Sequence, residues 1–130
     1  MRRLLLAGLA TTIGVAAALV VALAVFGDET KPVVDVPGGS AERGRHLIEY
    51  YGCGSCHTIS GVHSTSKYIG PPLNDFAERR FIAGKFPNTL AELMRWIEDP
   101  QALDPGNVMP TLGVKPQEAR DIAAFLYSDH

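Results

Sequence analysis

The chain has 130 residues and a formal net charge of −2. This length allows one small domain and a short additional segment. Without Arg2 and Arg3, ten lysines and arginines face fourteen aspartates and glutamates, so the remainder has a net charge of −4. A mildly acidic domain of this kind excludes a nucleic-acid-binding surface, although a local apolar or basic patch can still meet a partner.

The additional segment is residues 1–27, in which the run Leu4–Phe26 contains no charged residue. Such a run is long enough to cross a hydrocarbon core of roughly 30 Å as a helix. The basic flank at Arg2 and Arg3 favours a cytoplasmic N-terminus, so the rest of the chain is expected on the outer side. The alternative is a cleaved signal peptide, since Ala22-Leu23-Ala24 fits the cleavage pattern. We expect an uncleaved, single transmembrane anchor, because the run exceeds the usual signal length of about 7 to 15 residues.

Residues 28–39 are rich in proline and glycine and have no amphipathic period, so they are predicted to form a linker. Ser40 suits the N-cap of a helix that ends before Gly52. The apolar stripe of this helix comprises Gly44, Leu47, Ile48 and Tyr51. Gly44 is a poor helix former. It therefore indicates that another backbone packs closely there, unless it is a tolerated defect.

Immediately after this helix comes Cys53-Gly54-Ser55-Cys56-His57, which is typical of covalent haem attachment. Two thiols spaced three apart can form thioethers to adjacent haem substituents, and the next histidine can lie under the iron as an axial ligand. A Cys-x-x-Cys pair also suits a thioredoxin-like centre, a zinc site or a plain disulfide. However, the chain has only two cysteines, and His46 and His63 lie at spacings unlike the usual zinc pattern.

The chain beyond the motif is predicted to be irregular. Residues 58–68 read as a polar loop, in which His63 is a weak candidate for an alternative iron ligand. The following Gly70-Pro71-Pro72-Leu73 is a rigid extended piece. A histidine that binds a metal commonly donates its other ring N–H to a carbonyl, which fixes the ring plane. The carbonyl of Pro71 is the candidate acceptor for His57.

Thr89-Leu90-Ala91-Glu92 is a capping-box sequence, and it predicts a helix that stops at Asp99-Pro100. Apolar residues with helical spacing follow the cap, namely Leu90, Leu93, Met94 and Ile97. Trp96 flanks this stripe, where its ring would exclude water from a haem pocket, whereas Met94 is expected in the core. A loop is predicted over 101–110, and its Met109 is the candidate sixth ligand because thioether sulfur favours ferrous iron.

The last predicted helix opens at Pro116, since proline fits the first helical turn. Its apolar stripe comprises Ala119, Ile122, Ala123 and Leu126. The small side chains of Ala119 and Ala123 would let another helix approach. The helix that contains Gly44 is the expected partner.

Residues 40–130 resemble the monohaem class I cytochromes c, through the helix around Gly44, the haem motif, Gly70-Pro71-x-Leu73, Pro105-Gly106-x-x-Met109 and the last helix. The resemblance implies an all-α class I cytochrome c fold behind a single N-terminal transmembrane helix. It also implies one haem c, bound covalently through Cys53 and Cys56, with His57 and Met109 on the iron. The other residues implied at the haem are Pro71, Leu73, Trp96 and Arg79, with Arg80 as the alternative to Arg79 at a propionate.

Three further segments resemble the cytochrome domains attached to, or encoded with, bacterial haem-copper cytochrome c oxidases: Arg79-x-Phe81-Ile82-Ala83-Gly84, Pro87-Asn88-Thr89 and Trp96-Ile97-x-Asp99-Pro100-Gln101. The chain lacks the copper-site cysteines and the oxidase-subunit domain of the fused versions. The resemblance implies an electron carrier in the bacterial inner membrane, with its haem domain facing the periplasm. Its expected partners are an upstream donor complex and a terminal oxidase.

With both axial positions filled, no small-molecule substrate is expected at the iron, so the protein is not expected to be an enzyme itself. Two other classes of function stay open. The first is a haem enzyme acting on peroxide or a sulfur compound, for which the chain offers no evident general base. The second is a haem-based ligand sensor, although no signalling domain is present in the sequence.

Overall fold

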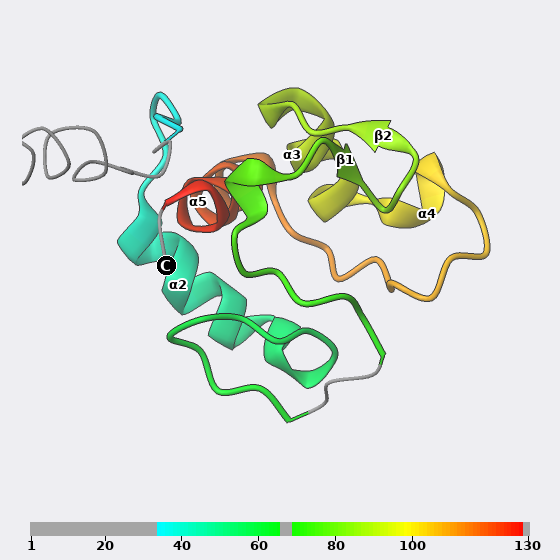
Figure 1. The fold of residues 1–130 in the computed structure, drawn as a ribbon, viewed down its shortest axis with the longest axis horizontal. Helices are drawn as coiled ribbons and strands as arrows, with labels where there is room; N and C mark the ends of the chain where they lie inside the picture. The colour runs from blue at the N-terminus through cyan, green and yellow to red at the C-terminus, as the bar shows by residue number, and fades with distance from the viewer. Residues whose placement is uncertain (1–33, 66–68, 129–130) are drawn as a thin grey trace, which may run out of the picture. The chain divides into compact units, whose positions relative to one another are not determined.

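Helices form most of the regular structure in this computed structural model, which describes residues 34–65 and 69–128. The longer helices are α2 (Ala41–Tyr50), α3 (Leu90–Glu98) and α5 (Pro116–Tyr127), and α4 (Pro100–Leu103) is a single turn (Figure 1). Two 3₁₀ turns are η1 (Cys53–Ser55) and η2 (Phe76–Glu78). Strands β1 (Phe81–Ile82) and β2 (Phe86–Pro87) pair antiparallel, with Phe81 opposite Pro87 and Ile82 opposite Phe86.

The helix ends follow the predicted signals. The Ser40 hydroxyl accepts a hydrogen bond from the Arg43 N–H at 3.3 Å, and the Thr89 hydroxyl accepts one from the Glu92 N–H at 3.3 Å. Pro116 occupies the first turn of α5. These contacts satisfy backbone donors that a helix leaves unpaired at its N-terminus. The predicted starts of all three longer helices are therefore confirmed.

The core is organised around α5, whose residues from Asp121 to Tyr127 are all buried. α5 packs most extensively on α2 and also contacts α3. At the crossing with α2 the backbones nearly touch, since a Cβ built on Gly44 would lie 2.0 Å from the Asp121 carbonyl oxygen. The predicted pairing of the Gly44 helix with the last helix is confirmed. This crossing fixes the end of α2, from which the Cys53–His57 segment continues.

An ion pair between the buried Asp121 and the exposed Arg43 joins the same two helices. Asp121 is only 3% exposed, and its carboxylate accepts hydrogen bonds from the Arg43 guanidinium at 2.9 Å and from the Ser40 N–H at 2.8 Å. The Arg43 hydrogen bond lowers the pKa of Asp121 and outweighs the opposing effect of burial. The carboxylate is therefore ionised and fully partnered, as a buried charge must be.

Two predictions differ from the structure. The linker predicted over 28–39 is packed at its C-terminal end, where Val36 is 5% exposed and the Gly38 carbonyl accepts a hydrogen bond from Gln117 at 2.9 Å. The apolar side chain of Val36 explains the difference, because it joins the core. The loop predicted over 101–110 begins with α4, because Asp99 caps a new turn and Pro100 occupies its first position.

Within residues 34–65 and 69–128, no helix has the length and apolarity needed to cross a membrane. The anchor predicted at residues 1–27 lies outside the described residues.

Candidate cofactor-binding site

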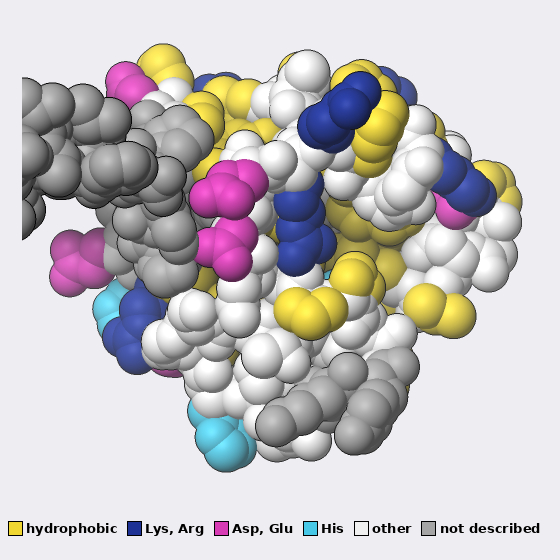
Figure 2. Space-filling view, in the orientation of Figure 1, with side chains coloured by type: hydrophobic (Ala, Val, Ile, Leu, Met, Phe, Trp, Pro, Cys, Tyr) yellow, Lys and Arg dark blue, Asp and Glu magenta, His cyan; other side chains and the backbone are white. Residues whose placement is uncertain are grey.

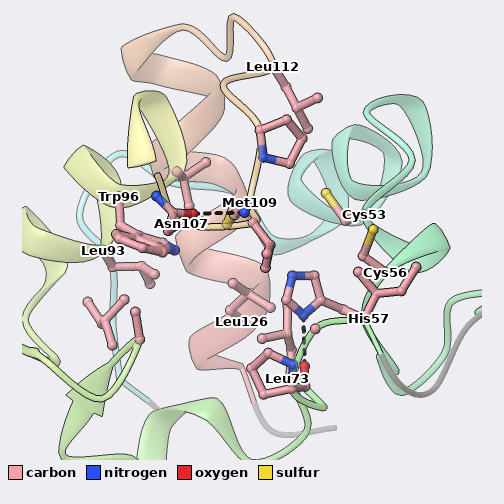
Figure 3. A pocket seen from close by; sticks show the side chains of 18 of the residues that line it. Cys53, Cys56, His57, Leu73, Leu93, Trp96, Asn107, Met109, Leu112 and Leu126 are labelled. Atoms are coloured by element: carbon pink, nitrogen blue, oxygen red, sulfur yellow. Dashed lines mark hydrogen bonds between the residues drawn. The ribbon is translucent and has the colours of Figure 1, made fainter. Parts of the chain in front are cut away.

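A largely apolar pocket of about 340 Å³ opens beside η1 and is also lined by segments from the rest of the domain. Figure 3 shows Cys53, Cys56 and His57 grouped on one side of the pocket, and Leu93 and Trp96 on the opposite side. This volume falls within the range of small-molecule and cofactor sites, roughly 300 to 1,000 Å³. Every residue that the sequence analysis places at the haem lines this pocket: Cys53, Cys56, His57, Pro71, Leu73, Arg79, Trp96 and Met109.

Cys53 and Cys56 stand at the pocket wall as free thiols, both partly buried. Gly52 ends α2 with a φ of 68°, and η1 then turns the chain so that both thiols reach the same pocket. Burial raises the pKa of the Cys53 thiol to about 11. Cys53 is therefore protonated and uncharged near neutral pH in this state of the chain.

His57 has a defined orientation, because its Nδ1 lies 2.7 Å from the Pro71 carbonyl oxygen. A carbonyl oxygen can only accept, so Nδ1 carries a proton, and Nε2 of the neutral ring then keeps its lone pair. This arrangement presents Nε2 as a metal ligand and holds the ring plane. The close packing of Gly70 also restricts the ring, since a Cβ at this position would lie 2.4 Å from His57 Cε1.

The chain that carries Pro71 is held in place on both sides of it. The Gly70 N–H donates to the Cys56 carbonyl at 2.8 Å, and the Leu73 N–H donates to the Thr58 carbonyl at 2.8 Å. Arg79 adds a third tie, because its guanidinium donates to the Pro72 carbonyl and, at 3.2 Å, to the Asn74 carbonyl. The acceptor for His57 is thus fixed by contacts that do not involve the histidine.

The structure distinguishes the two candidate arginines. Arg79 is half-buried at the pocket, its guanidinium lies 5.2 Å from the centre of the Phe76 ring, and burial lowers its pKa. Arg80 is exposed, packs over Phe81 at 5.8 Å and is not among the residues that line the pocket. Asn88 fixes the backbone of Arg79, since its side-chain nitrogen donates to the Arg79 carbonyl at 2.9 Å. Sequence reasoning assigned no role to this asparagine.

Trp96 and Leu73 contribute apolar walls. Trp96 is 9% exposed, and its ring centre lies 5.8 Å from that of Phe86 in a tilted arrangement. Leu73 is partly buried and packs against the core. Both side chains contribute apolar surface to the pocket lining.

Met109 comes from the loop between α4 and α5 and is the one methionine, among those described, that lines the pocket. Met94 packs against the core instead. His63 is exposed and outside the pocket lining. Two amide side chains hold the backbone of Met109: its N–H donates to Asn107 Oδ1 at 2.8 Å, and its carbonyl accepts from Gln101 Nε2 at 2.7 Å. Sequence reasoning missed both contacts.

The donor set fits haem c, because two free thiols, a histidine with its Nε2 lone pair available and a thioether share one apolar pocket. A zinc site needs four ligands of the cysteine, histidine or carboxylate type. Within the described ranges, no three His, Cys, Asp or Glu side chains come together in an arrangement that could hold a metal ion.

The sequence matches the cytochrome c family over residues 41–128, so the chain belongs to this family. It is a class I cytochrome c, and membership implies covalently bound haem c and haem-based electron transfer. The cytochrome c domain is mostly helical, which agrees with the predicted all-α fold class.

Among curated proteins, the chain is similar to cytochrome c oxidase subunit 2 of Alkalihalophilus pseudofirmus, with 37% identity over 89 residues. This alignment covers 68% of the chain and 25% of the relative. Cytochrome c oxidase subunit 2 of Bacillus sp. (strain PS3) is 32% identical over 61% of the chain and 22% of its own length. Cytochrome c oxidase subunit 2 of Bacillus subtilis is 27% identical, in an alignment that covers 67% of the chain and 25% of the relative. The chain thus spans about a quarter of the length of these relatives, and the resemblance to oxidase-associated cytochrome domains is confirmed.

Proposed function

We propose that this protein is a membrane-anchored cytochrome that carries single electrons to a terminal cytochrome c oxidase. The observation that carries the proposal is the gathering of two free thiols, one oriented histidine and one methionine around a single apolar pocket. Haem c, when bound, supplies an iron centre that changes between the ferrous and ferric states by one electron.

Four side chains hold this group. Cys53 and Cys56 would hold haem c through thioether bonds, and His57 would bind the iron through Nε2 while the Pro71 carbonyl holds its Nδ1 proton. Met109 would be the second protein ligand of the iron, a neutral thioether that raises the potential relative to a second histidine. With His57 and Met109 both bound to the iron, no small-molecule substrate would bind at the metal.

The remaining pocket residues set the surroundings of the haem. Leu73 and Trp96 exclude water, and burial of this kind is one of the means by which a protein tunes a haem potential. Arg79 supplies a guanidinium at the pocket to pair with a propionate. Its hydrogen bonds to the Pro72 and Asn74 carbonyls hold the guanidinium in place for this role.

The electron leaves through the apolar rim of the pocket, which we define as Ile69, Phe81, Val108 and Leu112. All four side chains are exposed, and Val108 is 83% exposed. Figure 2 shows hydrophobic side chains gathered around a hollow on this face. The oxidase is the partner proposed for the apolar rim, because the relatives that resemble this chain are oxidase subunits. An upstream complex supplies the electron.

The proposed location is the bacterial inner membrane, with residues 1–27 as a single-pass anchor and residues 40–130 as the haem domain in the periplasm. The uncharged run Leu4–Phe26 and its basic flank support this arrangement. The burial of Val36 supports a tether shorter than the full stretch of residues 28–39. A short tether keeps the domain at high effective concentration near complexes in the same membrane.

The proposal is tested by placing the full haem-loaded chain in lipid vesicles with the terminal oxidase purified from the same bacterium. With ascorbate as the reductant, we expect the chain to float with the vesicles and oxygen uptake to rise with the amount of the chain. The rise should disappear when cyanide blocks the oxidase. Oxygen uptake is measured with an electrode, and reoxidation of the haem is followed by absorbance.

The matched control is the same chain with Cys53→Ala and Cys56→Ala, which removes the attachment of haem and should support only background oxygen uptake. If the reduced protein is reoxidised no faster with the oxidase than without it, the oxidase is not the partner. If the chain stays behind when the vesicles float, the anchor at residues 1–27 is wrong.

A further inference from the structure

The loop that carries Met109 has little backbone hydrogen bonding of its own. The structure describes all of residues 104–110. Within this loop, a single backbone hydrogen bond is formed, from the Asn107 N–H to the Asp104 carbonyl at 3.2 Å. The backbone groups of such a segment need partners from side chains or water. The hydrogen bonds made by the Gln101 and Asn107 side chains therefore fix the position of the Met109 backbone.

Gln101 uses both ends of its amide on this loop. Its Nε2 donates to the carbonyls of Asn107, at 2.9 Å, and Met109, at 2.7 Å. Its Oε1 accepts a hydrogen bond from the Gly106 N–H at 3.1 Å. One half-buried side chain thus replaces three backbone partners that a regular structure would provide.

Asn107 completes the arrangement from inside the loop. Its Oδ1 accepts from the Met109 N–H at 2.8 Å, and its Nδ2 donates to the carbonyls of Pro100, at 2.9 Å, and Asp104, at 2.7 Å. Pro100 is fully buried at the start of α4. Both polar backbone groups of Met109 are therefore bonded to amide side chains that are tied to a fixed helix.

The two ends of the loop are tied as well. Lys85 Nζ lies 2.7 Å from the carboxylate of Asp104, and the Thr111 hydroxyl donates to Asp99 Oδ1 at 2.7 Å. Asp99 is also the N-cap of α4, since it accepts from the Ala102 N–H. The short helix that sequence reasoning missed is thus the support on which the Met109 loop is built.

We propose that Gln101 and Asn107 are positioning residues for Met109, which hold its backbone so that the thioether faces the pocket whether or not it is bonded to iron. This inference rests on the proposed role of Met109 as the sixth ligand. A ligand held in place competes effectively with external molecules, because little conformational freedom is lost when it binds. Weakening the amide contacts should therefore make Met109 easier to displace.

The test is binding of imidazole, a small external ligand, to the ferric full-length holoprotein carrying Gln101→Glu. The substitution keeps the size of the side chain but places an oxygen against the carbonyls of Asn107 and Met109. Loss of two hydrogen bonds and the new repulsion should raise the apparent imidazole affinity by about tenfold or more. The measurement is a titration followed by the absorbance change as sulfur leaves the iron.

The matched control is Ala102→Glu, which adds the same charge on an exposed position of the same helix and breaks no hydrogen bond of its side chain. Its imidazole affinity should stay within about twofold of the wild type. Asn107→Asp is the second variant, for use if Gln101→Glu does not fold. It removes the donors to Pro100 and Asp104 but keeps the acceptor for Met109, so it should raise the affinity in the same direction.

Repeating Gln101→Glu in a Met109→Ala background separates the positioning role from a direct effect. With the sulfur absent, we expect the substitution to change imidazole binding no further. An equal rise in both backgrounds, or no rise in the Met109 background, overturns the positioning role. If Met109→Ala alone leaves imidazole binding unchanged, the ligand assignment in the proposed function fails first, and the positioning role fails with it.

Discussion

Met109→Ala should open the haem iron to carbon monoxide, whereas the unaltered ferrous protein should show almost no change of absorbance when the gas is added. Met109 is the one described methionine at the pocket, and alanine cannot reach the metal from the same loop position. The amide contacts to the backbone of Met109 do not involve its side chain, so the loop should keep its shape. The measurement is the absorbance spectrum of the ferrous protein with and without carbon monoxide.

Met109→His should instead keep a six-coordinate, low-spin iron but lower the midpoint potential. Imidazole is a harder ligand than a thioether and stabilises the ferric state, and ligand choice contributes to a range of haem potentials of roughly 0.8 V. Met94→Leu is the control, because Met94 packs against the core outside the pocket and should leave the potential unchanged. An unchanged potential in Met109→His, together with no carbon monoxide binding in Met109→Ala, would show that Met109 is not an iron ligand.

Gly44→Ala should strongly destabilise the domain. Replacing a glycine inside a helix by alanine normally stabilises the helix by about 1 kcal/mol. Here the new Cβ would lie 2.0 Å from the Asp121 carbonyl oxygen and 2.6 Å from its carbon, both backbone atoms of the buried helix α5. Because both are backbone atoms, neither can rotate away from the new methyl group, and the two helices must move apart. Overpacking of this severity should lower the free energy of unfolding by about 3 kcal/mol or more.

Thermal unfolding of the haem-loaded protein measures this effect. A loss of this size should lower the Tm by more than about 10 °C in a domain of this length. His46→Ala is the control, since His46 is exposed on the same helix and its removal should change the Tm by only a few degrees. A Tm for Gly44→Ala close to that of the wild type would mean that the α2 and α5 contact does not support the fold.

The three longer helices could be predicted from the sequence because each carries its start signal locally, at Ser40, Thr89 and Pro116. The β1 and β2 hairpin could not. Each strand has only two residues, which is too short for a period to appear. The turn between them places Ala83 at a φ of 50°, a conformation that sequence patterns assign to glycine or asparagine.

Helix α4 was missed for a different reason. Asp99-Pro100 was interpreted as the end of one helix, which is correct, but the same two residues also begin the next. Aspartate is a good N-cap and proline a good first residue, so Asp99-Pro100 also predicts the start of a helix. These two residues were predicted only to end the preceding helix. The buried Val36 was missed because the stretch of valines that it ends is too short, between prolines, for a period to mark one of them as core.

The residues of the candidate site were found by their chemistry rather than by their surroundings. Cys53, Cys56 and His57 form a local motif, and Met109 is a soft donor in a turn-rich loop. The amides of Gln101, Asn107 and Asn88 could not be found in this way, because an amide has no distinctive chemistry until its partners are known. Only the folded chain brings Gln101 to the carbonyl of Met109, and Asn88 to that of Arg79.

The central claim is that Cys53 and Cys56 bind haem covalently, and acidic organic extraction of the denatured holoprotein tests it most directly. Thioether bonds survive both treatments, so the haem absorbance should stay with the polypeptide and its mass should exceed that of the bare chain by one haem. Metal analysis should find iron. Transfer of the haem into the organic phase, or zinc in place of iron, would contradict the account.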